Sequence, residues 1–313
     1  MPSIEALNLS KQYGSYTAIS DLNLKIEGAK CVGFLGPNGA GKTTTLKMFT
    51  DLITPSSGEA LINGVNVHRQ KKTALASVAS LIEMPEIYPA LTPREALTMI
   101  AEIRGVPKAE RNDRIEDAVS EVRMEEWIDK RVGKFSKGMK QRICVASTLL
   151  SNPCVILLDE PTTGLDPRGM SEVRDIIKSL KNKKRLIFMS SHLLSEVSDV
   201  CDEVAIIDHG KLIIYDKLSN VTAKVSGGEN VIEVGLRNEV SEELIKKIPV
   251  KVHGIGKAEK TDGATFRIRF AGGLDTQERI LADLVKMNIG IISYKPASSA
   301  LEEAYLSLIK DTL

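Results

Sequence analysis

The chain has 313 residues, of which 42% are hydrophobic and 27% charged, as in ordinary soluble globular proteins. This composition excludes a collagen-like chain, a disordered tail and a disulfide-rich miniprotein, and the length predicts about two domains. The formal net charge is +1, and residues 221–313 carry 13 basic and 13 acidic side chains. Neither part of the chain is therefore a polybasic module, and nucleic acid is not expected as a partner.

The sequence predicts no segment that spans a membrane. The longest stretch without Asp, Glu, Lys or Arg is 143–158, which serines, Asn152 and Pro153 interrupt, whereas a spanning helix needs about 20 mostly apolar residues. The N-terminus lacks the basic and then apolar pattern of a signal peptide. The four cysteines are far apart and form no CxxC pair, so we expect reduced thiols and a cytosolic protein.

Strands dominate the first 60 residues. Residues 4–9 and 22–26 alternate apolar and polar side chains, which predicts half-buried antiparallel strands. Residues 31–35 are wholly apolar, as in a central strand that is covered on both faces. A glycine-rich turn follows this strand, and residues 43–49 are compatible with a helix.

Helices and apolar strands alternate in the middle of the chain. Thr92, Pro93 and Glu95 predict the capped start of a helix. Helices are expected at 94–104, 109–122 and 137–150, and strands at 154–158, 185–189, 204–207 and 212–215. Such alternation indicates crossover units and a parallel sheet.

The pattern changes after a plausible linker at 226–228. We expect strands at 231–236, 252–260, 265–270 and 290–294, with helices at 239–248, 276–287 and 300–309. This order is typical of a small α+β domain of split βαβ type. The expected domains are therefore 1–220 and 221–313.

One segment matches a phosphate-binding loop. The pattern GxxxxGK[ST] is fitted at every fixed position by Gly36, Pro37, Asn38, Gly39, Ala40, Gly41, Lys42 and Thr43, followed by Thr44. It lies after an apolar strand and before a helix, where backbone N–H groups can cradle phosphates. Lys42 is expected to reach the β- and γ-phosphates of a nucleotide, and the Thr43 hydroxyl to ligate Mg²⁺.

Two acidic residues and a histidine follow later apolar strands. Asp159 ends a buried strand and can hold Mg²⁺, and the adjacent Glu160 can polarise an attacking water. An Asp-Glu pair alone would more often be a solvated turn, but a phosphate loop beside it favours the catalytic interpretation. His192 follows the next strand, which should neighbour that of Asp159, so its ring can meet the γ-phosphate.

These motifs, in this order, resemble the nucleotide-binding subunit of an ABC (ATP-binding cassette) transporter over residues 1 to about 215. The segment 135–142, Phe-Ser-Lys-Gly-Met-Lys-Gln-Arg, is similar to the family signature, with Ser136 and Gly138 matching and Lys137 and Met139 departing from it. Without the family, Ser136 would simply be a helix N-cap. The resemblance implies an α/β fold: a P-loop NTPase core with an antiparallel β subdomain and a helical subdomain, followed by the small C-terminal α+β domain.

The resemblance also assigns further residues. Tyr13 occupies the place of the aromatic residue that stacks on adenine, with Tyr16 as a less well placed competitor. Asp166 matches the loop that acts across a dimer interface, and His192 matches the family's switch histidine. Glu83 stands where the family usually has a Gln that touches Mg²⁺ and faces the membrane subunit. Some peptide-antibiotic exporters share its Ile-Glu-x-Pro pattern, which favours a similar cargo.

The expected function is that of a subunit that hydrolyses ATP with Mg²⁺ as a head-to-tail homodimer. It would drive a separate integral membrane permease, an exporter of drugs, peptides or lipids, from the cytoplasmic face of the membrane. Lys42, Glu160 and His192 are the expected catalytic residues. A segment at 299–306 is similar to the C-terminal segment of drug-export ATPases, and its alternative interpretation is an amphipathic helix.

Two other classes remain open at this point. The first is a soluble ABC-type ATPase that acts on ribosomes or DNA. Its one supporting feature is the basic run Lys181, Lys183, Lys184 and Arg185, which we expect to be a solvated loop. The second is a nucleotide-sensing regulator that does not hydrolyse ATP, against which the intact Lys42, Asp159 and Glu160 argue.

Overall fold

The computed structural model describes residues 1–83, 87–225 and 229–296. The chain divides into two compact units, Met1–Asp216 and Lys217–Leu313. The domain boundary proposed from the sequence lies a few residues later, between 220 and 221. The expected linker at 226–228, the expected helix at 300–309 and the 299–306 segment lie outside the described residues.

An antiparallel sheet forms from the start of the first unit, with strand order β2–β1–β4–β5. Leu22, Leu24 and Ile26 are buried while the residues between them are exposed, because only one face of the sheet meets the core. The expected strands at 4–9 and 22–26 are both present and are longer than expected. The four strands are β1 (Ser3–Tyr13), β2 (Tyr16–Glu27), β4 (Ser57–Ile62) and β5 (Val65–Asn66).

A second, six-stranded sheet has the order β10–β9–β3–β8–β7–β6. The pairs β3–β8, β3–β9, β7–β8 and β6–β7 are parallel, so β7 and β8 are neighbours as expected. Every residue of β3, β7 and β8 is buried, because helices or the other sheet cover both faces. The strands are β3 (Cys31–Leu35), β6 (Val78–Leu81), β7 (Val155–Leu158), β8 (Leu186–Ser191), β9 (Glu203–Asp208) and β10 (Lys211–Lys217). Four helices accompany these sheets: α1 (Lys42–Phe49), α2 (Lys71–Leu75), α6 (Pro167–Lys181) and α7 (Leu194–Val200).

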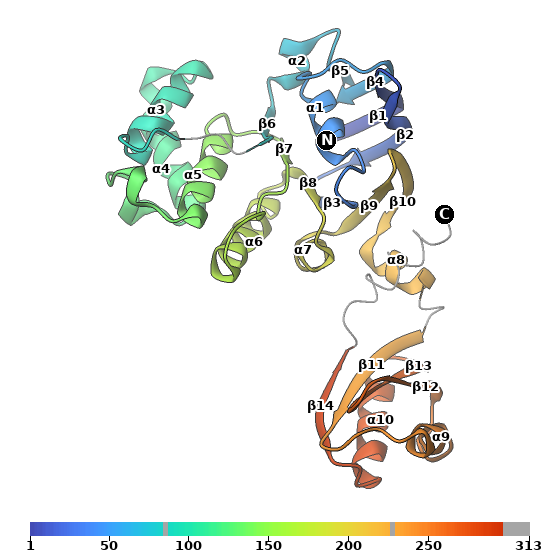
Figure 1. Cartoon of the computed structure of the whole chain (residues 1–313). Helices are drawn as coiled ribbons and strands as arrows, with labels where there is room; N and C mark the ends of the chain where they lie inside the picture. The colour runs from blue at the N-terminus through green and yellow to red at the C-terminus, as the bar shows by residue number, and fades with distance from the viewer. Residues whose placement is uncertain (84–86, 226–228, 297–313) are drawn as a thin grey trace. The chain divides into compact units, whose positions relative to one another are not determined.

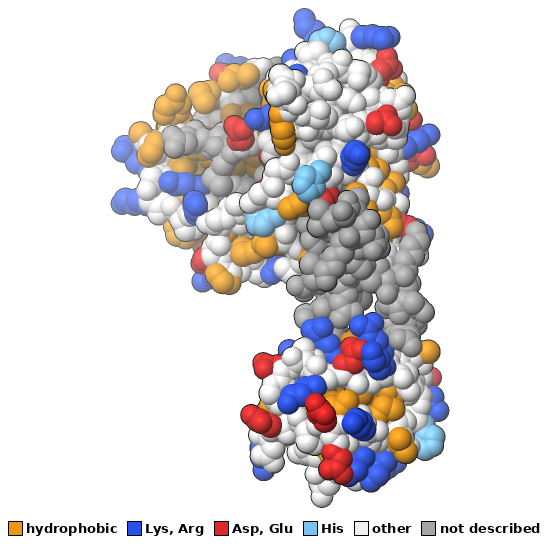
Figure 2. Space-filling view, turned by 45° about the vertical axis from the view of Figure 1, so that its right-hand side comes forward, with side chains coloured by type: hydrophobic (Ala, Val, Ile, Leu, Met, Phe, Trp, Pro, Cys, Tyr) orange, Lys and Arg blue, Asp and Glu red, His pale blue; other side chains and the backbone are white. Residues whose placement is uncertain are grey.

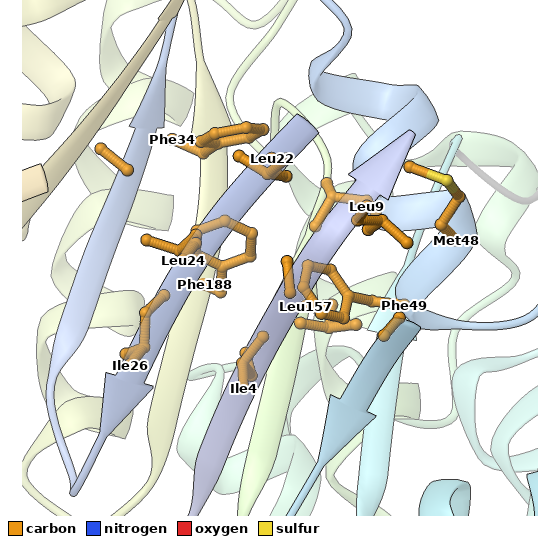
Figure 3. Close-up of a cluster of buried hydrophobic side chains, with 14 of the residues drawn as sticks. Ile4, Leu9, Leu22, Leu24, Ile26, Phe34, Met48, Phe49, Leu157 and Phe188 are labelled. Atoms are coloured by element: carbon orange, nitrogen blue, oxygen red, sulfur yellow. The ribbon is translucent and has the colours of Figure 1, made fainter. Parts of the chain in front are cut away.

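The two sheets share one apolar layer (Figure 3). Ile4, Leu22 and Leu24 enter it from the antiparallel sheet, and α1 adds Met48 and Phe49. The rings of Phe34 and Phe188 lie 5.1 Å apart, and Phe49 meets Phe188 edge-on at 6.2 Å. These contacts anchor α1 between the sheets, and the residues that precede α1 are those of the expected phosphate loop.

Three helices gather at one side of the first unit, beyond β6 and β7 (Figure 1). The start of α3 is a capping box, in which the Thr92 hydroxyl accepts from the Glu95 N–H and the Glu95 carboxylate accepts from the Thr92 N–H. Each expected helix is present within a few residues of its expected bounds. The helices are α3 (Pro93–Ile103), α4 (Arg111–Glu121) and α5 (Lys137–Leu149), with short 3-10 turns at Lys108–Glu110, Glu125–Trp127 and Val132–Lys134.

The basic run between α6 and β8 is solvated at Lys183 and Lys184, as expected of a loop, but not at Arg185. Arg185 is only 5% exposed, and its guanidinium binds the Glu121 carboxylate of α4 at 2.7 Å. Lys183 also binds Glu121, and Lys181 binds Asp202. The prediction was wrong for Arg185, because its partner carboxylate lies far away in the sequence. The run therefore links α4 to the parallel sheet.

The second unit is an α+β sandwich with its own core. Its sheet has the order β12–β13–β11–β14, with antiparallel pairs throughout. Phe266, Ile268 and Phe270 of β13 point into the core with Ile280 and Leu284 of α10. The elements are α8 (Leu218–Val225), β11 (Glu229–Leu236), α9 (Glu242–Lys251), β12 (Ile255–Asp262), β13 (Thr265–Ala271), α10 (Leu274–Lys286) and β14 (Ile291–Pro296).

The helix predicted at 239–248 begins and ends later in the structure, as α9. The Ser241 hydroxyl accepts from the Leu244 N–H and caps the helix, so residues 239–241 lie outside it. At the other end the helix continues through Pro249 to Lys251.

The four cysteines are free thiols, of which Cys154 is half-buried and the other three are buried. The sulfur atoms of Cys31 and Cys201 lie 3.6 Å apart. No helix within the described ranges combines the length and the apolar character that crossing a bilayer requires.

Candidate functional site

The loop between β3 and α1 is held in a shape that only its glycines permit. A Cβ on Gly36 would lie 2.3 Å from the Ile207 carbonyl oxygen of β9. Gly41 has a φ of +104°, and a Cβ there would lie 2.3 Å from Ile19 Cδ1. Because both positions exclude a side chain, the loop can pack closely on its neighbours and still present its N–H groups at the N-terminus of α1.

Lys42 is the first residue of α1, and its side chain turns back over the loop. Its ammonium group donates to the carbonyl oxygens of Gly36 at 2.8 Å and Pro37 at 3.0 Å. The residue is only 5% exposed. Its charge thus lies at the phosphate loop.

A pocket opens in front of this loop. Two tyrosines contribute to it, Tyr13 at the end of β1 and Tyr16 at the start of β2, and both residues are about half exposed. The Tyr16 hydroxyl lies 3.4 Å from the Gly39 carbonyl oxygen, so Tyr16 is as well placed here as Tyr13. The pocket is lined by Tyr13, Tyr16, Ala18, Asn38, Gly39, Gly41, Lys42, Thr43, Thr44 and Glu160.

Asp159 and Glu160 follow β7 and are both held by a single serine. Ser190, fully buried at the end of β8, donates its hydroxyl to the Asp159 carboxylate at 2.5 Å. The same hydroxyl accepts the backbone N–H of Glu160 at 2.9 Å. Glu160 itself has a φ of +44°, an uncommon backbone conformation for a residue other than glycine. The neighbouring strand thus sets the directions of both acidic residues.

Glu160 lies between the side chains of Lys42 and His192. One carboxylate oxygen is 3.4 Å from the Lys42 ammonium, and the other is 3.1 Å from His192 Nδ1. Partial burial raises the pKa of Glu160, but the Thr163 hydrogen bond and the charges of His192 and Lys42 outweigh it, so the pKa lies below its usual value. Glu160 therefore stays a carboxylate at neutral pH.

Thr43 and Asp159 supply oxygen donors of the kind that Mg²⁺ prefers. In the part of the chain that the structure describes, no group of three His, Cys, Asp or Glu side chains forms a complete metal cage. A magnesium ion that enters with a nucleotide needs few protein ligands, because phosphates and waters complete its shell. One hydroxyl and one carboxylate fit that requirement.

Ser136, Gly138 and Asp166 form a second group, at the N-termini of α5 and α6. The Ser136 hydroxyl accepts the Met139 N–H at 3.2 Å, and the Asp166 carboxylate accepts the Gly169 N–H at 3.1 Å, so each residue caps its helix. A Cβ on Gly138 would lie 3.3 Å from the Gly169 Cα, so the two helices approach closely at this point. These residues do not line the pocket at the phosphate loop.

The comparisons with known proteins agree with one another. A family model described as ABC transporter matches residues 19–163. The bacitracin transport ATP-binding protein BcrA of Bacillus licheniformis is 36% identical over 310 residues, which cover 98% of this chain and 97% of that protein. The chain belongs to the ATP-binding subunits of ABC transporters.

Other ABC proteins are similar over part or all of the chain. The daunorubicin/doxorubicin resistance ATP-binding protein DrrA of Streptomyces peucetius is 28% identical over 98% of this chain and 92% of that protein. The lantibiotic transport ATP-binding protein SrtF of Streptococcus pyogenes is 38% identical over 68% of this chain and 92% of that protein. The solved structure of an ATP-binding subunit of an ABC transporter matches 71% of this chain and 92% of that chain, with a TM-score of 0.62 and 29% identity.

Family membership confirms the expected α/β fold with a P-loop NTPase core, and it makes the chain an ABC-type ATPase that binds ATP.

Glu83, which was expected beside Mg²⁺, pairs with a lysine in the structure. Its carboxylate binds the Lys47 ammonium of α1 at 2.7 Å, and its side chain is 72% exposed. Its φ is +61°. Glu83 thus neutralises a lysine on the helix that follows the phosphate loop.

Sequence reasoning missed three buried polar residues around the loop that follows Glu160. They are Gln141 of α5, Ser190 of β8 and Glu196 of α7. The Gln141 amide donates to the Pro161 carbonyl oxygen at 2.7 Å. The sequence offered two signals for these residues: two serines end an otherwise apolar strand, and a Glu follows four residues after His192. Their burial depends on tertiary contacts, so the pattern alone does not identify them.

Proposed function

We propose that this chain is the ATP-hydrolysing subunit that powers a separate membrane permease for the export of drugs, peptides or lipids. The proposal rests above all on one observation: Glu160 lies between Lys42 and His192 at a P-loop pocket. The names of BcrA, DrrA and SrtF, all transport or resistance proteins, support the class of cargo. Among the residues that the structure describes, no comparable feature favours a ribosomal, DNA-directed or purely regulatory role.

In this proposal the pocket binds MgATP as substrate. Tyr13, with Tyr16 beside it, stacks on the adenine ring, and the backbone N–H groups of residues 36–44 surround the phosphates. The Lys42 ammonium leaves the loop carbonyls and binds the β- and γ-phosphates. Thr43 and Asp159 would hold Mg²⁺, with Glu83 near its outer shell. Bound Mg²⁺ would neutralise phosphate charge as the β–γ bond breaks.

Glu160 orients the water that attacks the γ-phosphate. Its low pKa keeps it ionised, so it accepts a hydrogen bond from water rather than donating one. Lys42 and the loop N–H groups offset the charge that develops on the phosphate oxygens. His192 contacts the Glu160 carboxylate through Nδ1 and would bind the γ-phosphate through its other ring nitrogen.

A second copy of the chain completes the site in this proposal. Ser136 caps α5 and Gly138 lies in its first turn, and the N-terminus of this helix of 13 residues carries partial positive charge. Placed against the γ-phosphate of a facing copy, this terminus supplies donors that one subunit lacks. Asp166 would act in the same interface. ATP thus joins two chains head to tail, and hydrolysis releases them.

The two units take different parts in this proposal. Residues 1–220 form the ATP-binding cassette, which docks on the permease at the cytoplasmic face of the membrane. Residues 221–313 form an accessory domain. Lys, Arg, Asp and Glu side chains are interspersed on the drawn face of the second unit (Figure 2). Binding of nucleic acid would instead favour a patch of basic side chains alone.

Substitution of the proposed water-orienting residue tests this function. We expect Glu160→Gln to lower ATP turnover by the purified full chain at least 100-fold, because the amide no longer accepts the proton of the attacking water. ATP binding should remain, and the nucleotide-bound variant should accumulate as a dimer in size-exclusion chromatography.

Glu203→Gln provides a matched control. Glu203 is a partly buried acidic residue that binds Lys30 at 2.8 Å, and it begins β9 at the end of the parallel sheet opposite to the phosphate loop. Its turnover should stay within about twofold of the unsubstituted chain. Equal turnover of the Glu160 variant and the unsubstituted chain would remove Glu160 from the mechanism.

A further inference from the structure

A buried carboxylate outside the expected site joins two of its segments. Glu196 of α7 is only 2% exposed. Its two oxygens accept hydrogen bonds from two hydroxyl groups, one from Thr162 and one from Ser191 at 2.6 Å. Thr162 and Ser191 are themselves each 1% exposed. Glu196 thus lies in a closed polar cluster inside the first unit.

Both donors belong to segments that carry proposed catalytic residues. Thr162 lies two residues after Glu160, and Ser191 directly precedes His192. The Ser191 hydroxyl also accepts the Leu193 N–H at 2.9 Å, so it fixes the backbone on the far side of His192. Through these two hydroxyls, the Glu196 carboxylate connects the loop of Glu160 to the turn of His192.

Other contacts of the same loop show why this connection matters. Ser190 holds the Glu160 N–H, and Gln141 holds the Pro161 carbonyl oxygen. The Glu196 bond to Thr162 is the next one along the chain. Three consecutive residues are therefore held by buried side chains from α5, β8 and α7. Burying a carboxylate costs free energy, which its hydrogen bonds must offset.

We infer that Glu196 is a positioning residue for ATP hydrolysis. It sets the separation of Glu160 and His192, which meet at 3.1 Å, by binding both of their segments at once. It is not among the residues that line the pocket at the phosphate loop. Its loss should therefore slow the chemical step and leave nucleotide binding intact. This inference rests on the proposed function.

The test compares Glu196→Gln with Thr162→Val in the full chain. Gln keeps the shape of the side chain but replaces an acceptor oxygen by a donor, and charge-assisted hydrogen bonds become neutral ones. We expect a fall of about tenfold in kcat for each variant and a KM for ATP within about twofold. The double variant should also lose about tenfold, because both changes break the same connection.

Hydrogen exchange provides a readout that does not depend on turnover. The amides of residues 160–165 should exchange faster in Glu196→Gln than in the unsubstituted chain, while those of residues 36–44 should not change. If the unsubstituted chain hydrolyses no ATP, the proposed function fails, and the exchange measurement still tests the connection.

Glu121→Gln is the matched control, because Glu121 is a partly buried acidic residue in a separate ion pair with Arg185. It should lose stability without a change in kcat beyond about twofold. A kcat within twofold of the unsubstituted chain for Glu196→Gln would overturn the inference. Unchanged exchange in residues 160–165, or a double variant whose loss is the product of the two single losses, would also overturn it.

Discussion

At the scale of single residues, several side chains of the proposed site already have a structural task. Asp166 is the N-cap of α6, and Ser136 is the N-cap of α5. Both were singled out for a role across a dimer interface. A substitution at either position therefore changes helix stability as well as any contact with a second copy, and the two effects need different variants to be separated.

Asp166 offers such a separation. We expect Asp166→Ala to lower the free energy of unfolding by about 1 kcal/mol, because the Gly169 N–H loses its acceptor. Asp166→Asn should cost only a few tenths, since Asn caps helices about as well as Asp. Urea denaturation measures both values. If the carboxylate acts in the dimer interface as proposed, ATP turnover should fall in both variants. An Asn variant as unstable as the Ala variant would show that the cap is not what Asp166 contributes.

The residues that sequence reasoning found share one property: their chemistry is visible in a local pattern. The phosphate loop is a run of glycines with a lysine, and Asp159 and Glu160 end an apolar strand. Gln141 and Glu196 have no such pattern, because each is polar on a helix face that would otherwise be buried among apolar side chains. Their role becomes clear only from the structure, in which they bind the loop that follows Glu160.

At the scale of helices and strands, local signals were most reliable where they were strongest. The wholly apolar strands β3 and β7 and the capping box of α3 appear close to their expected positions. The strand β6 was not anticipated. It has four residues, with Ser80 among them, and it exists because β7 lies beside it at the edge of the sheet. Whether such a segment forms a strand depends on pairing with a strand that is distant in the sequence, so local propensity does not predict it.

The contact between α4 and the parallel sheet gives a prediction at this scale. Glu121→Ala leaves the buried Arg185 guanidinium without its main partner, and we expect a loss of about 3 kcal/mol in the free energy of unfolding. Thermal or urea denaturation measures the loss. A change below about 1 kcal/mol would mean that Arg185 reaches water or another acceptor when Glu121 is removed.

The same pair makes stability depend on pH. Burial raises the pKa of Glu121, but the hydrogen bonds and charges of Arg185 and Lys183 outweigh it, so the folded-state pKa lies below the usual value. The contribution of Glu121 is therefore present above the unfolded pKa of about 4.3 and is lost as the pH falls through the folded-state value. The Glu121→Ala variant should lack this part of the acid destabilisation.

At the scale of the whole molecule, each unit has its own hydrophobic core. The cluster around Phe34, Phe49 and Phe188 draws only on the first unit, and the cluster around Phe266 and Phe270 draws only on the second. The pocket and every other residue of the proposed site lie in the first unit. Two cores of this kind should unfold as two cooperative transitions.

Calorimetry of the full chain with and without nucleotide tests this expectation. MgATP at 100 times its dissociation constant stabilises the unit that binds it by about 2.7 kcal/mol. We therefore expect one transition to move to higher temperature and the other to stay in place. A single transition, or an equal shift of both, would show that the two cores do not unfold separately.

Because the cores are separate, a substitution in one core should affect the stability of its own unit only. A substitution that loosens the packing of Phe266 or Phe270 weakens only the second unit, so the nucleotide site survives it. The reverse holds for Phe188 and its neighbours. Selection can therefore act on the two units of the chain almost independently. The accessory unit can acquire new surfaces while the other unit keeps its ATPase site.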